Sequence, residues 1–177
     1  MREESLEILK TMQYDCTKTA VEFIPLYERM RLKQPMDLIG DFDNGTTHMN
    51  HYRFYYFGDY LDCHASTEKN LIEVGMKRVS EELPYSVDNF ALATSLCNDL
   101  NEGYFAAKVL CYPDYDKGAI CFDVWFQSVV PQTPDDMDYM VEGVTILAGI
   151  VREKVDSMVE LFDPAKKDKQ NTEKHYD

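Results

Sequence analysis

Residues 104–162 constrain the fold most, because they combine two strand-like runs, a turn and a long helix. Residues 106–112 and 119–130 are rich in apolar, β-branched and aromatic side chains, and the segment between them, 113–118, is rich in Pro, Asp and Gly. Two such runs around such a turn predict a β-hairpin. Residues 133–136, Thr-Pro-Asp-Asp, then predict the start of a helix: a hydroxyl cap, a Pro in the first turn and acids near the positive end of the helix dipole.

The predicted last helix is apolar around most of its circumference. Between Tyr139 and Val151 the only charged residue is Glu142. A sheet face covers one stripe of a helix, so the other apolar sides need further cover. We expect that cover to come from another helix of the chain or from a second chain.

Two more helices are predicted. Apolar residues recur every three or four positions from Leu6 to Met30, which indicates an amphipathic helix, and Pro25 removes one backbone donor, so this helix should kink or restart near Ile24. A second helix is expected after the cap residue Ser86, with Gly103 ending it in the left-handed conformation. Its expected buried face consists of Phe90, Ala93, Leu96 or Cys97, and Leu100.

The middle of the chain predicts a three-stranded meander. The aromatic run 51–57 and the run 60–64 flank Gly58-Asp59, which we interpret as a two-residue hairpin turn. Residues 71–79 alternate between apolar and polar positions and predict a half-buried third strand. Before them, residues 36–42 are interpreted as a short edge strand, followed by a turn at Asn44-Gly45.

These elements predict one α+β domain over residues 1–162, with the order αβββαββα and an antiparallel sheet of about five strands flanked by helices. Residues 163–177 are polar and predict a flexible tail.

Charge and cysteine content limit the classes of function. Lys plus Arg is 18 and Asp plus Glu is 32, so the net charge of −14 argues against nucleic acid and membrane surfaces as partners. The first residues lack a signal-peptide pattern, and no apolar run is long enough to cross a bilayer. The five cysteines never occur at CxxC spacing, so we expect reduced thiols and a cytoplasmic protein. A pair of Cys111 and Cys121 across the predicted hairpin is the one disulfide candidate.

One short sequence resembles a known family. Residues 98–101, Asn-Asp-Leu-Asn, followed by 106–108, Ala-Ala-Lys, are similar to a helix-to-strand step in YbjN-like domains, which have the type III secretion chaperone-like fold. The resemblance covers residues 86–162 best, and it implies a non-enzymatic, protein-binding domain that is often dimeric. The residues themselves favour a plainer use, because Asn near a helix end can adopt the left-handed conformation and bond free carbonyls.

The residues do not predict catalysis or a cofactor. Aspartates lie near predicted turns without a paired spacing, and no phosphate loop, GxSxG or HExxH sequence is present. His48, His51 and His64 are weak candidates for a metal site, because His48 and His51 point to opposite faces of an extended strand. Cys63 and His64 fail as a catalytic dyad for the same reason. We expect no metal, no cofactor and no enzyme.

A binding surface is the positive expectation. Aromatic residues crowd the first predicted hairpin, and apolar residues remain on the outer sides of the last helix. Such residues are enriched at protein interfaces. The candidate partner-binding residues are Tyr52, Tyr55, Tyr56, Tyr60, Tyr139, Ile146 and Ile150. We expect a chaperone-like or adaptor-like domain that binds a partner protein or a second copy of itself. The alternatives are a small-ligand or metal-binding domain with an aromatic-lined pocket near the first hairpin, and a structural homo-oligomer.

Overall fold

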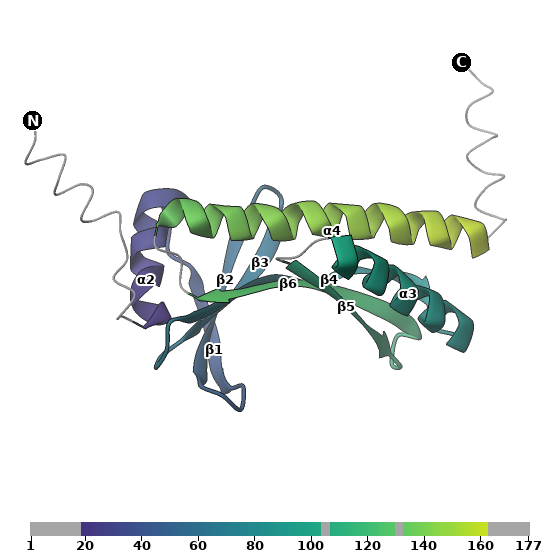
Figure 1. Cartoon of the computed structure of the whole chain (residues 1–177), viewed down its shortest axis with the longest axis horizontal. Helices are drawn as coiled ribbons and strands as arrows, with labels where there is room; N and C mark the ends of the chain where they lie inside the picture. Colours follow the sequence, from purple (N-terminus) through teal and green to yellow (C-terminus); the bar gives the residue numbers. More distant parts are fainter. Residues whose placement is uncertain (1–18, 104–106, 130–132, 163–177) are drawn as a thin grey trace, which may run out of the picture. The chain divides into compact units, whose positions relative to one another are not determined.

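A computed structural model describes residues 19–103, 107–129 and 133–162 (Figure 1). In these residues it has six strands and three α-helices, one of them continued by a π-helix. The elements are α2 (Ala20–Tyr27), η1 (Glu28–Leu32), β1 (Asp37–Asp43), β2 (His48–Tyr56), β3 (Asp59–Ser66), β4 (Leu71–Pro84), α3 (Val87–Gly103), β5 (Ala107–Asp114), β6 (Ala119–Val129) and α4 (Pro134–Phe162).

The α+β class is confirmed, with one strand more than expected. The open antiparallel sheet has the order β1-β2-β3-β4-β6-β5, which contains the predicted meander and the predicted hairpin as neighbours. The extra strand is β1, where the sequence indicated a short edge strand and the structure has a seven-residue strand that pairs with β2 through six of its residues. The expected tail, residues 163–177, lies outside the described residues.

The described chain divides into two compact units. The first takes its residues from 1–77 and 125–145, and the second from 78–124 and 146–177. Strands β4 and β6 and helix α4 contribute residues to both units. We describe each unit by itself.

Cross-strand register gives the first unit one apolar face and one polar face. On the apolar side, Phe54 pairs with Leu61, and Cys63 pairs with Val74. Tyr27 of α2 lies near Cys63 on this face and donates a hydrogen bond to Asp138 of α4, with 2.8 Å between Oη and Oδ1. We call this side the covered face, because α2 and the start of α4 pack on it. We call the other side the open face.

The first helix differs from the expectation at Pro25. Helix α2 runs through this proline as a continuous α-helix and does not restart near Ile24. The winding changes three residues later, where the N–H of Glu28 is shared between the carbonyls of Ile24 and Pro25 and the π-helix η1 begins. Lys33, with φ of 56°, then ends the helix. The missing N–H of Pro25 removes the helical hydrogen bond to the Val21 carbonyl, one turn earlier, and the α-helix nevertheless continues to Tyr27.

The β2–β3 turn is displaced by one residue from the prediction. Tyr56 pairs with Asp59, so the two central residues are Phe57 and Gly58 rather than Gly58 and Asp59. Their φ values are 45° and 101°, both in the left-handed range. Two positive φ values define the tight hairpin turn that usually contains Asn-Gly. Phe57 is therefore an unusual residue for its position.

Strand β4 is longer than predicted because a bulge resets its alternation. Arg78 has φ of 52°, and it is exposed next to the exposed Lys77, so Val79 returns to a buried position one residue late. The buried carboxylate of Asp123 accepts the backbone N–H of Arg78 at 2.8 Å and the hydroxyl of Tyr112 at 3.1 Å. Strict alternation ends near this bulge, which is why the sequence pattern indicated a strand end near Val79.

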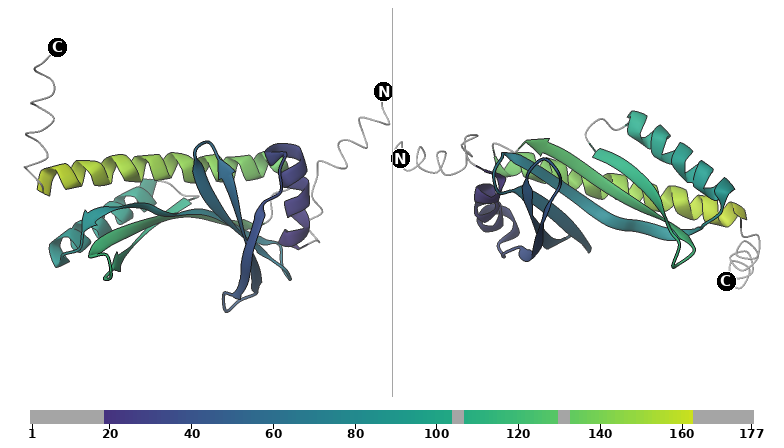
Figure 2. Two further views of the ribbon diagram at one scale, coloured as in Figure 1. Left: turned by 180° about the vertical axis from the view of Figure 1, so that it is seen from behind. Right: turned by 90° about the horizontal axis from the view of Figure 1, so that it is seen from below.

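In the second unit, α3 runs beside the edge strand β5 (Figure 2). The predicted cap is present, because Ser86 Oγ accepts the backbone N–H of Asn89 at 3.0 Å. Gly103 is the last residue of the helix, and its φ is not positive, so the expected left-handed ending at this residue is wrong.

Asn101 joins α3 to β5 through its side-chain amide. Its Oδ1 accepts the Val109 N–H at 2.7 Å, and its Nδ2 donates to the Val109 carbonyl at 3.0 Å. The amide therefore occupies the backbone groups that a further strand would use, which protects the sheet edge. The structure gives Asn101 a plain structural use.

We expect Asn101→Ala to lower the free energy of unfolding by about 1–2 kcal/mol, because it leaves both backbone groups of Val109 without this partner. Asn98→Ala is the matched control, since Asn98 is exposed on the same helix and the change in helix propensity is the same. Urea denaturation measures both. Equal effects of the two substitutions would contradict the structural role of Asn101.

Candidate functional site

The tip of the β2–β3 hairpin carries a cluster of exposed aromatic side chains. We call Tyr55, Phe57 and Tyr60 the tip cluster; they are 51%, 87% and 66% exposed. The rings of Tyr55 and Tyr60 meet edge to face with 5.3 Å between centroids, because these residues are cross-strand partners on the open face. The Phe57 ring meets the Tyr56 ring at 4.7 Å. One ring contact within the cluster and one to Tyr56 thus hold these side chains while they remain accessible.

A hollow of about 370 Å³ lies beside this cluster. It is lined by Arg31, Leu32, Tyr55, Tyr56, Phe57 and Asp138. The Arg31 guanidinium forms ion pairs with Asp135 and Asp138, the latter with 2.8 Å between Nε and Oδ2. The hollow therefore has aromatic walls and a charged group whose position is fixed.

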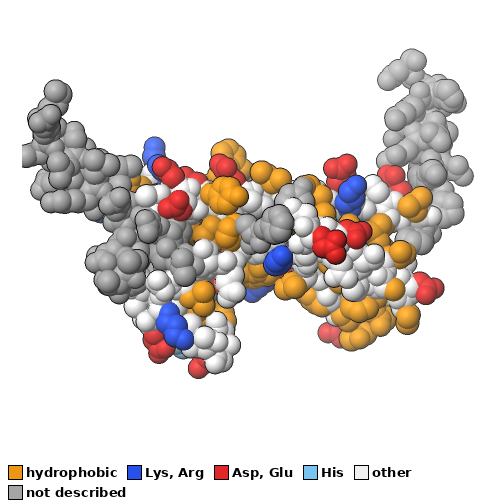
Figure 3. Space-filling view, viewed as in Figure 1, with side chains coloured by type: hydrophobic (Ala, Val, Ile, Leu, Met, Phe, Trp, Pro, Cys, Tyr) orange, Lys and Arg blue, Asp and Glu red, His pale blue; other side chains and the backbone are white. Residues whose placement is uncertain are grey.

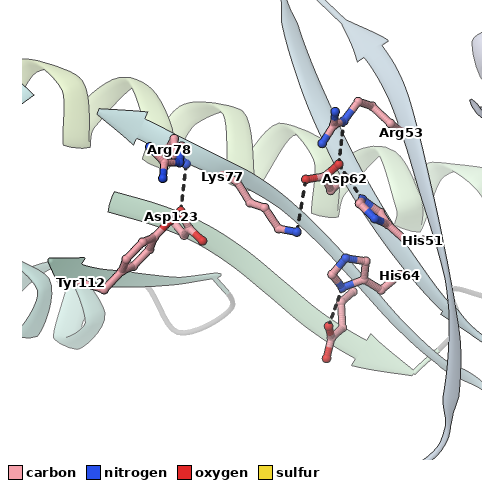
Figure 4. A network of polar contacts seen from close by, with 9 residues as sticks. His51, Arg53, Asp62, His64, Lys77, Arg78, Tyr112 and Asp123 are labelled. Atoms are coloured by element: carbon pink, nitrogen blue, oxygen red, sulfur yellow. Dashed lines mark hydrogen bonds and ion pairs between the residues drawn. The ribbon is translucent and has the colours of Figure 1, made fainter. Parts of the chain in front are cut away.

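The open face also carries a polar network centred on Asp62 (Figure 4). The Asp62 side chain is almost completely buried, and its Oδ1 lies 2.8 Å from Nε2 of His51 and 2.9 Å from Nε of Arg53. Its Oδ2 lies 3.8 Å from Nζ of Lys77. Cross-strand pairing places Arg53 and Gly75 on either side of Asp62, which brings these charges together. We call His51, Arg53, Asp62 and Lys77 the open-face network.

The network holds Asp62 in its ionised form. Burial by itself would raise the pKa of this carboxyl, but the hydrogen bonds from Arg53 and His51, with their charge, hold its pKa below the usual range. A carboxylate with these partners is a structural anion rather than a free base.

His64 lies next to the network. Its Nδ1 is 3.2 Å from a Glu73 carboxylate oxygen, its ring is 4.7 Å from the Trp125 ring, and 4.9 Å separate it from the His51 ring. Within the described residues its buried Nε2 has no hydrogen-bond partner. The Lys77 ammonium lies 5.6 Å from the centre of the Trp125 ring. Histidine, tryptophan and lysine thus form one layer over the open face.

The structure separates the aromatic residues that the sequence grouped together. Tyr55 and Tyr60 are on the open face, whereas Tyr52 and Tyr56 are half-buried on the covered face. On α4, Tyr139 and Ile146 are exposed and Ile150 is half-buried. Figure 3 shows exposed hydrophobic side chains close to acidic ones on the surface in this view. Phe57, the most exposed aromatic residue of the tip, was missed because the turn was placed one residue too late.

The histidines do not converge on a metal site. His48 Nε2 is 3.0 Å from a carboxylate oxygen of Asp41, whereas the imidazole of His51 faces Asp62. None of the three candidate histidines lines the hollow. Among the described residues, the grouping of metal-ligand atoms that does occur is Glu81, Asp114 and Cys121.

That grouping already has its counter-ions. Arg78 bonds Glu81 at 2.6 Å and Asp114 at 2.7 Å, and Lys117 bonds Glu81 at 2.8 Å. Both carboxylates are therefore neutralised by side chains, and burial raises the pKa of Cys121. A metal ion would have to displace two cations, so this cluster fits an ion-pair network better than a metal centre.

Cys63 and His64 lie on opposite faces, as strand alternation requires. Cys63 is fully buried on the covered face, and this burial raises its pKa, so its thiol stays protonated. The four cysteines in the described residues are free thiols, as expected, and the candidate pair of Cys111 and Cys121 is not bonded.

Comparison with known protein families, curated proteins and solved structures found no match. The resemblance to YbjN-like domains therefore stays a hypothesis. Among the helices that the structure describes, none combines the length and apolar character needed to cross a membrane.

Proposed function

We propose that this chain is a non-catalytic, chaperone-like or adaptor-like domain that binds a partner protein through the tip cluster and the adjoining hollow. The observation that supports this most is the conformation of Phe57, which is 87% exposed with φ of 45°. The left-handed conformation costs a bulky residue about 1–2 kcal/mol, and exposing an aromatic ring adds nothing to folding. A role in binding therefore explains this strained and exposed residue better than a role in the stability of the fold does.

The surroundings of Phe57 suit a protein partner. Aromatic side chains are the residues that most often dominate interface energies, and they act best next to a pocket that a partner side chain can fill. The hollow supplies that pocket, and Tyr55 lines it as well as belonging to the tip cluster. The α+β class agrees with the resemblance to secretion chaperones, and this proposal takes its chaperone-like character from that resemblance.

In this proposal, a second copy of the chain is one of the partner proteins. Tyr139 and Ile146 are exposed on α4, seven residues apart. A small apolar ligand is the second candidate occupant of the hollow, since about 370 Å³ falls within the range of small-molecule sites. Native mass spectrometry of the purified protein distinguishes a dimer from a ligand-bound monomer by mass.

We expect Phe57→Asn to separate stability from binding. The substitution creates the Asn-Gly pair that this turn favours, so the free energy of unfolding should rise by about 1 kcal/mol and the Tm by about 2–4 °C. Partner capture should fall by about tenfold or more, as for an interface residue worth at least 1.4 kcal/mol. Thermal denaturation measures the first effect. Quantitative affinity capture from an extract of the native host measures the second.

Tyr115→Ala is the matched control, because Tyr115 is an exposed aromatic residue in the β5–β6 turn, 72% exposed. It should leave capture unchanged. If Phe57→Asn raises the Tm and the captured proteins stay the same in kind and amount, the tip cluster is not the binding surface. A bound small molecule that is lost in Phe57→Asn would favour the second candidate.

A further inference from the structure

Cys97 and Cys111 are neighbouring thiols in the second unit. Cys97 faces inward from α3 and is 5% exposed, whereas Cys111 is half-buried on the edge strand β5. Thr94, three residues before Cys97 on α3, has its Oγ1 3.8 Å from Cys111 Sγ, and each of the two thiols shifts the pKa of the other. The Cys111 sulfur therefore has a second thiol and a hydroxyl beside it.

The contact between Asn101 and Val109 explains why the thiols face each other. Asn101 follows Cys97 by four residues, so the two share one side of α3. Val109 precedes Cys111 by two residues along β5. Because the Asn101 amide binds both backbone groups of Val109, it sets the register of helix against strand and places Cys97 next to Cys111.

The two thiols differ in their ionisation. Hydrogen bonds from Cys97 and Thr94 lower the pKa of Cys111 to about 6, although partial burial acts in the opposite direction. Cys111 is therefore the thiol of the pair that ionises more readily. Its hydrogen bond to Cys111, together with burial, raises the pKa of Cys97, which stays protonated.

We propose that Cys97 and Cys111 are a peroxide-responsive dithiol, in which accessible Cys111 reacts first and buried Cys97 resolves the product as an intramolecular disulfide. The site goes beyond the proposed binding function and does not depend on it. Its substrate class is the small hydroperoxides, including hydrogen peroxide, which reach a half-buried sulfur. In a reducing compartment such a disulfide is transient and acts as a switch.

The reaction has two steps. The Cys111 thiolate attacks one hydroperoxide oxygen, the O–O bond breaks, and Cys111 becomes a sulfenic acid while the leaving alkoxide, or hydroxide, takes a proton from water. The Cys97 sulfur then attacks the Cys111 sulfur; the S–O bond breaks, and the hydroxide leaves as water with the proton from Cys97. Two thiols lose two electrons in total, and the hydroperoxide is reduced to an alcohol, or to water.

The first measurement uses the full-length protein and hydrogen peroxide. Peptide mass spectrometry under non-reducing conditions should find a Cys97–Cys111 cross-link with a loss of two hydrogens, and a thiol reductant should reverse it. Cys97→Ala should instead accumulate the sulfenic acid at Cys111, which dimedone traps. Cys121→Ala is the matched control for removing a buried thiol, and it should keep the cross-link.

The second measurement is the rate of Cys111 alkylation by iodoacetamide against pH. We expect a midpoint near pH 6 in the wild-type protein. Thr94→Val and Cys97→Ala should each move the midpoint upward, because each removes one hydrogen bond to the thiolate. A midpoint near 8.5, the value of an ordinary thiol, would remove the basis for Cys111 as the attacking group.

The proposal is overturned if peroxide leaves Cys97 and Cys111 unlinked while the protein stays folded by circular dichroism. Cross-links that join Cys111 to another chain, or to Cys121, would overturn it equally. A cross-link that persists in Asn101→Ala at an unchanged rate would show that the amide contact does not place the two thiols.

Discussion

Gly75→Ala should lower the free energy of unfolding by about 2–3 kcal/mol, a large effect for the addition of one methyl group. A Cβ at this position would lie inside the van der Waals radii of Trp125 ring atoms, with Cζ3 at 2.7 Å. The indole lies flat over the strand at Gly75, between His64 and Lys77. The ring would have to leave this position and lose both neighbours, so the penalty follows from the ring rather than from the strand backbone.

The tryptophan also provides the readout, because Trp125 is the only one in the chain. Its fluorescence maximum should shift to longer wavelength in Gly75→Ala, while urea denaturation gives the stability. Gly40→Ala is the matched control: Gly40 lies in strand β1 with nothing within 4 Å of its Cβ position, so its effect should stay within about 0.5 kcal/mol.

A double-mutant cycle tests the cause. Trp125→Ala removes the ring, so adding Gly75→Ala to that variant should have little further effect, with a coupling energy of about 2 kcal/mol. If the effects of the two substitutions on the free energy of unfolding simply add, the clash with Trp125 is not the reason for the loss of stability in Gly75→Ala.

The sequence predicted the elements whose residues are close in the chain. Turn and cap residues such as Ser86, Thr133 and Gly118 act over a few positions, and the period of apolar residues gave the hairpin of β5 and β6. The sequence indicated β1 only as a short edge strand, because its acidic residues and Gly40 are also typical of a loop. Acidic residues on an edge strand also discourage pairing with other chains. Features that depend on residues close in the sequence can therefore be predicted without knowledge of the fold.

The contacts that build the site depend on register and packing between distant segments. Arg53 meets Asp62 only because the turn is centred on Phe57 and Gly58, and an error of one residue would separate them. Trp125 reaches Gly75 from another strand, and Cys97 reaches Cys111 only once α3 lies beside β5. The one candidate disulfide considered from the sequence, Cys111 with Cys121, followed from the hairpin alone and did not include the helix.

Asp62→Asn should lower the free energy of unfolding by about 2–3 kcal/mol at pH 7. An amide keeps the shape of the side chain but removes the negative charge that His51, Arg53 and Lys77 share. The charged groups of Arg53 and Lys77 are then held together without the carboxylate that lies between them. The guanidinium of Arg53 and the ammonium of Lys77 are partly exposed, which keeps the loss below that of a fully buried pair.

The effect of Asp62→Asn should depend on pH in a defined direction. The folded-state pKa of Asp62 lies below its ordinary value of 3.8, so its ionisation stabilises the fold above that value, and the stabilisation is lost as the pH falls through the folded-state pKa. The difference between wild type and variant should therefore be constant from pH 7 to about 5 and shrink below pH 4. Urea denaturation at pH 7, 5, 4 and 3 measures it. Asp116→Asn, an exposed turn position, should change stability by less than about 0.5 kcal/mol throughout. A wild-type advantage that stays constant down to pH 3 would mean that the Asp62 charge does not stabilise the open-face network.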